Sequence, residues 1–231
     1  MSRTGSDLPP DELLPAVEME TGGPVTSAVI WLHGLGADGH DFEPIVPYLG
    51  LRDRGVRFVF PHAPRRPVTI NMGLIMRAWY DIGGADLQGG VDEKGIRASA
   101  QAVEALVARE RGRGVDSRRI VLAGFSQGGV IALHVALRHE EPLAGVIALS
   151  TYLPDASARE TELVAANGGT PIFQGHGTED PLVPLERGEQ ARDRLRRLGH
   201  PLTWKTYPME HSVCPEEIDD VGAWLRERLA G

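Results

Sequence analysis

The chain alternates short apolar runs with longer segments in which apolar residues recur every three or four positions. Several of the short runs are continuously apolar, as expected for strands of a sheet that is covered on both faces. We predict strands at residues 28–32, 57–60, 120–123, 145–149, 172–174 and 202–207. The helical spacing predicts helices at residues 96–107, 129–139, 191–198 and 218–229. This alternation predicts an α/β fold with a mostly parallel sheet flanked by helices.

Two segments depart from the alternation. Residues 14–20 and the glycine-rich turn at 21–24 predict an antiparallel edge hairpin, so that residues 1–23 form an N-terminal extension and edge strand. Residues 61–93 show no helical pattern but contain several large apolar side chains. A connection this long inside a compact domain is usually functional. No domain boundary is visible, and we expect residues 1–231 to form a single domain.

Composition narrows the possible partners and location. The chain is 42% hydrophobic and 24% charged, as in an ordinary globular protein, and its net charge of −8 argues against a nucleic-acid partner. No stretch approaches the roughly 18 apolar residues of a membrane span, and the first twenty residues lack a signal-peptide pattern. The single cysteine, Cys214, cannot form an internal disulfide and fits a reducing compartment. We expect a cytoplasmic protein without stable membrane insertion.

The most informative motif is Gly-Phe-Ser-Gln-Gly at residues 124–128, between a predicted strand and a predicted helix. In this context Gly-x-Ser-x-Gly forms a sharp elbow that presents its serine at a helix N-terminus, where developing negative charge is stabilised. The rival glycine-rich motifs, a dinucleotide-binding loop and a phosphate-binding loop, are absent from the sequence. The motif therefore predicts Ser126 as a nucleophile.

A serine nucleophile needs an imidazole base, which follows it in chain order in elbow-type hydrolases. His211 lies after the last predicted strand and before the last helix, where such a base belongs. Of the other downstream histidines, His176 could line the site without being the base. His134 and His139 fall within the helix after the elbow, and His200 lies in a helix-end turn. We therefore favour His211.

The base needs a carboxylate that fixes its tautomer. Asp180 follows a predicted strand, at the sheet edge where catalytic groups gather in open α/β sheets. Three other acids compete: Glu179 is expected to be solvated, Asp155 to cap a helix, and Glu210 precedes the predicted base. We favour Asp180.

Two backbone amides are expected to stabilise the oxyanion. One is the amide of Gln127, directly after the nucleophile, and the other is that of Leu35, in the glycine-rich loop after residues 28–32. Metal chemistry has little support, because His-Glu-x-x-His is absent and His211 with Cys214 supplies only half a site.

Six separate blocks in this order resemble the phospholipase/carboxylesterase family of α/β-hydrolases, from about Pro24 to the C-terminus. The blocks are residues 32–39 (LHGLGADG), 61–71 (PHAP and RPVTIN), 79–82 (WYDI), 124–129 (GFSQGG), 176–184 (HGTEDPLVP) and the loop of His211. The resemblance implies an α/β-hydrolase fold without a large cap domain, no cofactor, the triad Ser126–Asp180–His211 and the same two oxyanion amides. Family members often form dimers, so a homodimer is possible.

The resemblance also implies an activity and a substrate groove. We expect a serine carboxylesterase acting on short- to medium-chain esters, with acyl-protein thioesterase or lysophospholipase activity as the alternative. A non-catalytic ligand-binding protein is the alternative from another class, and an intact triad disfavours it. Residues 70–80 resemble the loop that forms the acyl groove. The expected substrate-binding residues are Ile70, Met72, Leu74, Trp79 and Leu182.

Overall fold

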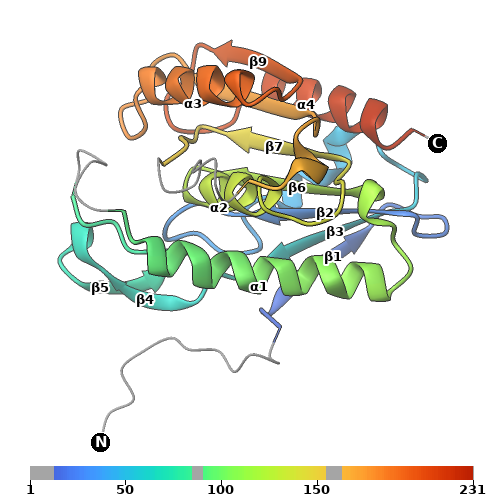
Figure 1. Ribbon diagram of the computed structural model, residues 1–231, viewed down its shortest axis with the longest axis horizontal. Helices are drawn as coiled ribbons and strands as arrows, with labels where there is room; N and C mark the ends of the chain where they lie inside the picture. The colour runs from blue at the N-terminus through green and yellow to red at the C-terminus, as the bar shows by residue number, and fades with distance from the viewer. Residues whose placement is uncertain (1–12, 85–90, 155–162, 231) are drawn as a thin grey trace, which may run out of the picture.

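The computed structural model describes residues 13–84, 91–154 and 163–230. Its centre is a seven-stranded sheet in the order β1-β3-β2-β6-β7-β8-β9 (Figure 1). The strands are β1 (Ala16–Glu20), β2 (Ser27–Leu32), β3 (Val56–Pro61), β6 (Ile120–Phe125), β7 (Gly145–Leu149), β8 (Ile172–Gly177) and β9 (Leu202–Tyr207). All neighbouring strands are parallel except β1 and β3. The predicted mostly parallel sheet is confirmed.

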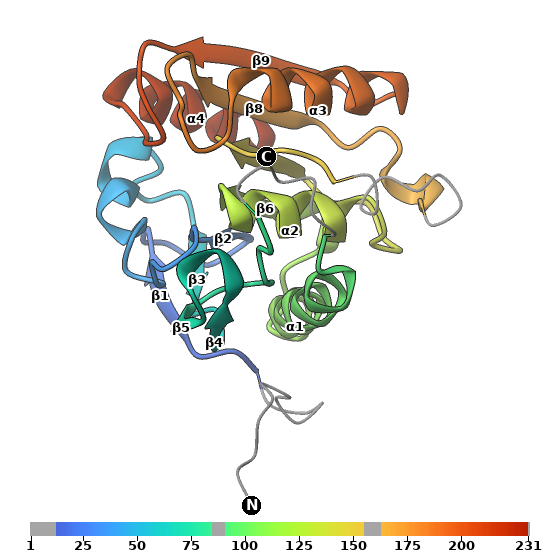
Figure 2. The same cartoon turned by 90° about the vertical axis from the view of Figure 1, so that its left-hand side faces the viewer.

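Helices cover both faces of this sheet (Figure 2). One face carries α1 (Glu93–Gly112), α2 (Gln127–Ala136) and α3 (Leu185–Arg197), and the other carries α4 (Pro215–Arg228) with the 3₁₀ helix η1 (Glu43–Leu49). Strand β2 shows why the strands are continuously apolar. Ile30 packs in the core under the first face, whereas its neighbours Val29 and Trp31 pack under the second. Alternate residues of a strand point to opposite faces, so a doubly covered strand has no polar side.

The predicted N-terminal hairpin is wrong in its pairing. Strand β1 is an antiparallel edge strand, but it pairs with β3 rather than with β2. The segment between β1 and β2 bonds to the residues that precede β3: Asp53 N donates to Thr21 O at 2.6 Å, and Gly55 N donates to Gly22 O at 2.9 Å. The turn therefore passes across the start of β3, which lies between the two strands.

Residues 61–93 contain a small second sheet that the sequence pattern did not predict. Strand β4 (Arg65–Val68) pairs antiparallel with β5 (Leu74–Arg77), and the 3₁₀ helix η2 (Thr69–Asn71) joins them. This sheet lies beside the first turn of α1 (Figure 1). Two four-residue strands, one containing Pro67, are too short and too irregular for a clear alternation. Within the described ranges no separate cap domain covers the sheet, and no helix is both long and apolar enough to cross a bilayer.

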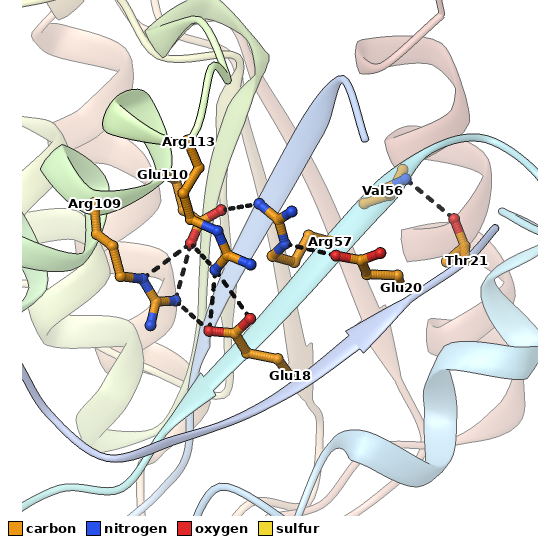
Figure 3. A network of polar contacts seen from close by, with 8 residues as sticks. All are labelled: Glu18, Glu20, Thr21, Val56, Arg57, Arg109, Glu110 and Arg113. Atoms are coloured by element: carbon orange, nitrogen blue, oxygen red, sulfur yellow. Dashed lines mark hydrogen bonds and ion pairs between the residues drawn. The ribbon is translucent and has the colours of Figure 1, made fainter. Parts of the chain in front are cut away.

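An ionic network ties the edge strand β1 to α1 (Figure 3). The carboxylate of Glu110 is completely buried and contacts three guanidinium groups, those of Arg57, Arg109 and Arg113, at 2.7–3.1 Å. Glu18 on β1 pairs with two of these groups, those of Arg109 at 2.8 Å and Arg113 at 2.9 Å. The network thereby joins β1, β3 and α1 at a distance from the carboxyl ends of the parallel strands.

Candidate active site

Ser126 lies at a strained turn between β6 and α2. Its backbone has φ 53° and ψ −120°, a conformation that non-glycine residues rarely adopt. The turn is tight because a Cβ on Gly124 would lie 2.4 Å from the backbone of Gly128, and one on Gly128 would lie 2.4 Å from Leu32 O. Thr151 Oγ1 donates a hydrogen bond to Ser126 O at 2.7 Å. These contacts hold the serine at the N-terminus of α2, as the elbow motif predicts.

Asp180 and His211 form a hydrogen-bonded pair at the same edge of the sheet. They follow β8 and β9, which are parallel neighbours, so that the two strand ends bring together residues that are far apart in the sequence. His211 Nδ1 lies 2.7 Å from Asp180 Oδ2. An ionised carboxylate can only accept, so Nδ1 carries a proton, and in the neutral ring Nε2 is then the nitrogen with the lone pair. The imidazole is thus oriented with one basic nitrogen free.

The other carboxylate oxygen of Asp180 is held by the backbone. Oδ1 accepts hydrogen bonds from Leu182 N at 2.9 Å and from Val183 N at 2.8 Å, and the side chain is completely buried. Both amides stabilise the ionised form without neutralising it. The ring of His211 also packs against Phe125, the residue before the serine, with 4.8 Å between ring centroids.

A cavity of about 430 Å³ lies beside the elbow and the His211 loop. Ser126 and His211 both line it, as do the two predicted oxyanion residues, Leu35 and Gln127. Within the described part of the chain neither backbone amide of those two residues donates a hydrogen bond. The remaining wall is largely apolar. The volume is in the range of sites for small organic ligands.

The structure separates the predicted substrate-binding residues into two groups. Ile70 and Leu182 line the cavity and are partly exposed. Met72, which follows η2, and Leu74, the first residue of β5, do not line it, and 98% and 64% of their surfaces are exposed. Trp79 does not line it either, because the whole residue is buried beneath the loops. These three residues lie outside this cavity, and their contact with substrate stays a prediction.

The competing acids and histidines occupy other places. Glu179 and Glu210 are exposed, and Asp155 lies outside the described residues. His176 is completely buried, its Nε2 donates to Val183 O at 2.8 Å, and it lies 3.7 Å from Asp180 Oδ2. Burial lowers the pKa of His176, which favours a neutral ring that packs beneath the acid. The remaining three, His134, His139 and His200, are buried and do not line the cavity.

Two tyrosines in the cavity wall contribute polar groups. The hydroxyls of Tyr80 and Tyr152 lie 2.9 Å apart, and both residues line the cavity. Burial raises the pKa of both, so that both remain neutral hydrogen-bonding groups. Tyr152 has no sequence signal, because it follows β7 in a loop without a recognisable motif.

The described residues contain no group of three or more His, Cys, Asp or Glu side chains that could hold a metal ion. Cys214 is a free, partly buried thiol whose pKa is raised by burial. A raised pKa disfavours the thiolate, so Cys214 is a poor candidate for a nucleophile.

Comparison with known proteins identifies the family. The family model for Phospholipase/Carboxylesterase matches residues 15–229. Acyl-protein thioesterase 1 of Gibberella zeae is 40% identical over 88% of this chain and 91% of its own length. Acyl-protein thioesterase 1 of Neurospora crassa is 41% identical over 95% of this chain and 92% of its own length. The crystal structure of Arabidopsis thaliana SOBER1 has a TM-score of 0.83 and 30% identity, covering 88% of this chain and 99% of that one.

The match extends over nearly the whole described chain and agrees with the layered sheet and the elbow. The relatives are named thioesterases, which disfavours the non-catalytic alternative. The chain therefore belongs to the phospholipase/carboxylesterase family of α/β-hydrolases and is an enzyme that hydrolyses ester-type bonds.

Proposed function

We propose that the chain is a serine hydrolase that cleaves the thioester bond of an acylated protein or peptide, with Ser126, His211 and Asp180 as its catalytic triad. The observation that carries this proposal is the 2.7 Å bond between Asp180 and His211, next to a cavity that the imidazole shares with Ser126. A carboxylate that fixes the imidazole beside a serine at an elbow is the arrangement that activates a hydroxyl.

The reaction proceeds in two displacements. Ser126 Oγ attacks the acyl carbonyl carbon while His211 Nε2 takes the hydroxyl proton. The imidazolium then gives this proton to the leaving thiol as the bond between carbon and sulfur breaks, and an acyl-enzyme remains. Water attacks the acyl-enzyme, with Nε2 again taking and returning a proton, and releases the carboxylic acid. Asp180 stays ionised throughout and stabilises the imidazolium.

The amides of Leu35 and Gln127 stabilise the oxyanion of both tetrahedral intermediates. Both residues line the cavity, and both N–H groups lack an internal acceptor within the described ranges. The amide of Gln127 is the first of helix α2, so the helix dipole adds to its effect.

The acyl chain occupies the apolar part of the cavity. Ile70, Ile82 and Leu182 supply apolar wall there, and no described side chain of the wall carries a positive charge apart from a protonated His211. An uncharged apolar tail gains free energy on entering such a cavity, whereas a charged group would lose hydration.

The preference for a thioester rests on the relatives. Carboxylesterase activity was the first expectation from the sequence, but two relatives at 40% and 41% identity are both named acyl-protein thioesterase 1. The thioesterase alternative is therefore favoured over the carboxylesterase.

We also propose that the chain acts as one domain in the cytoplasm, where its free Cys214 fits a reducing environment. The homodimer stays a prediction for sedimentation analysis.

Two experiments test these assignments. Replacing Ser126→Ala should lower kcat by on the order of 10⁶ and abolish labelling by a fluorophosphonate probe. A variant that keeps a tenth of the activity would show that Ser126 is not the nucleophile.

The second experiment tests the substrate class with matched peptides that carry C2 to C16 acyl chains, attached through cysteine sulfur or through serine oxygen. We expect a higher kcat/KM for the thioester at each length above the shortest. A preference for the oxygen ester at every length would restore the carboxylesterase.

A further inference from the structure

Given the proposed function, on which this inference rests, we infer that Trp79 is a positioning residue that fixes the spacing between the two oxyanion amides. Those amides belong to two segments that are far apart in the sequence, the loop of Leu35 and the elbow of Gln127. Within the described ranges no hydrogen bond joins residues 34–37 directly to residues 126–128. The paired strands β2 and β6 bring the two segments together as far as Leu32 and Gly124, and beyond these residues Trp79 bridges them.

Trp79 bonds to both segments. Its indole Nε1 donates to His33 O at 2.8 Å, and its backbone N donates to the side-chain Oε1 of Gln127 at 2.8 Å. The same Gln127 carboxamide donates from Nε2 to Tyr80 O at 2.7 Å. The carboxamide is therefore held at both ends by the segment that contains Trp79, and the indole reaches the loop on the other side.

His33 carries this contact onward to the oxyanion loop. Its Nδ1 donates to Gly34 O at 2.7 Å, and its Nε2 accepts from Ala63 N at 3.1 Å. Only the neutral ring with its proton on Nδ1 satisfies both bonds. Burial lowers the pKa of His33 to about 4, so this form persists at neutral pH. The link from Trp79 thus ends one residue before Leu35.

Trp79 is itself held from the opposite side. Its carbonyl oxygen accepts hydrogen bonds from Arg66 Nη1 at 3.2 Å and from Ser99 Oγ, which belong to β4 and α1. Trp79 is completely buried, so each polar atom that lost its partner would be left without a bond to water. The neighbouring Arg77 adds a parallel support, because its carbonyl accepts from Gly36 N at 2.9 Å.

Loss of the hydrogen bond from the Trp79 indole should destabilise the transition state more than the bound substrate. If the indole N–H is removed, the buried carbonyl of His33 loses its donor and the loop is free to shift. A small shift moves the Leu35 amide away from the oxyanion while the acyl cavity stays intact. Because oxyanion donors act on charge that appears during the reaction, kcat should fall and KM should change little.

The test compares two buried tryptophans. Trp79→Phe removes an indole that donates a hydrogen bond, whereas Trp31→Phe removes an equally buried indole whose Nε1 has no partner among the described residues. We expect Trp79→Phe to lower kcat by on the order of 10- to 100-fold with KM within about threefold, as for a misplaced donor. Trp31→Phe should leave both constants near wild type even if thermal stability falls.

A second measurement separates positioning from general damage. Ser126 Oγ attacks the carbonyl of a trifluoromethyl ketone with an acyl-like tail, and the tetrahedral adduct carries an oxyanion. The matching methyl ketone binds mainly through its tail. Trp79→Phe should weaken the trifluoromethyl ketone by the same factor as kcat and leave the methyl ketone unchanged. Equal losses for both ketones, or a kcat within threefold of wild type, would overturn the inference.

If Trp79→Phe does not fold, 3-benzothienylalanine at position 79 replaces the N–H by sulfur with little change in shape. The same losses of kcat and trifluoromethyl ketone affinity are expected, and wild-type values would overturn the inference. Fluorophosphonate labelling of Ser126 in the wild-type chain is scored separately. An unlabelled Ser126 defeats the proposed function, whereas labelled Ser126 with an unaffected Trp79 variant defeats only this inference.

Discussion

Two completely buried carboxylates, Asp180 and Glu110, differ in the partners that surround them. Glu110 contacts three guanidinium groups, which are permanently charged (Figure 3). Asp180 accepts two hydrogen bonds from neutral backbone amides and one from His211. Both groups are stabilised as anions, but only Asp180 directs its charge toward a partner whose own charge can change.

The comparison shows how surroundings separate structural from reactive acids. Three fixed cations neutralise Glu110, so its charge serves to join β1, β3 and α1. Two amides hold Asp180 in place without cancelling its charge, which remains available to an imidazole that gains a proton during a reaction cycle. The type of donor, rather than the depth of burial, distinguishes the two acids.

Of the three buried acids, the one at the active site should give the largest effect when it is changed. Asp180→Asn should lower kcat by on the order of 10⁴, because the amide favours the wrong imidazole tautomer while the oxyanion donors remain. Steady-state kinetics with a thioester substrate measures this. The matched control is Glu179→Gln, an exposed neighbour that should keep wild-type kcat. The reverse result, with damage at Glu179 and none at Asp180, would show that the acid is misassigned.

Changing the structural acid should affect stability and not rate. Glu110→Gln leaves three guanidinium groups without their central anion and should lower the free energy of unfolding by roughly 3–5 kcal/mol. The control Glu20→Gln removes a half-exposed partner of Arg57 and should cost about 1 kcal/mol or less. Urea denaturation measures both, and kcat of the folded enzyme should stay unchanged. A rate loss without a stability loss would reverse the assigned roles.

A third buried carboxyl sharpens the comparison because it has no partner. Glu217 on α4 is buried, and neither of its oxygens is hydrogen-bonded within the described chain. Burial, with a smaller effect of Asp220, raises its pKa from 4.5 to about 8. The unfolded chain therefore ionises first, so stability from this group is full below pH 4.5 and is lost as the pH rises toward about 8.

Replacing Glu217→Gln should remove this loss. At about 1.4 kcal/mol per pH unit, we expect the variant to gain about 3 kcal/mol in unfolding free energy at pH 7 and almost nothing at pH 4.5. Urea denaturation of both proteins at the two pH values measures the gain. An equal difference at both values would mean that ionisation of Glu217 is not its cause.

The sequence predicted the parts of the fold that repeat a simple pattern. The strands of the parallel sheet are continuously apolar because both faces are covered, and the elbow has a motif of its own. The proximity of Asp180 and His211 followed from their places after strands, once those strands proved to be neighbours.

The failures have physical causes. The N-terminal hairpin was predicted from a turn, but the backbone bonds of that turn to Asp53 and Gly55 place β3 between the two strands. The family resemblance placed Trp79 in the substrate groove, whereas in the structure its N–H groups bond to His33 and Gln127 in the interior. A hydrophobic pattern predicts that the ring of a tryptophan is buried, but it does not show where the indole N–H donates.

The contact between Phe125 and His211 has a consequence for the evolution of the enzyme. Phe125 immediately precedes Ser126 in the sequence and also packs against the ring of His211. A single position therefore affects both the proton donor and the proton acceptor of the proposed reaction. A substitution at Phe125 therefore changes the support of His211 together with the residue next to Ser126. A randomised library selected for activity should therefore retain bulky side chains there and discard small ones.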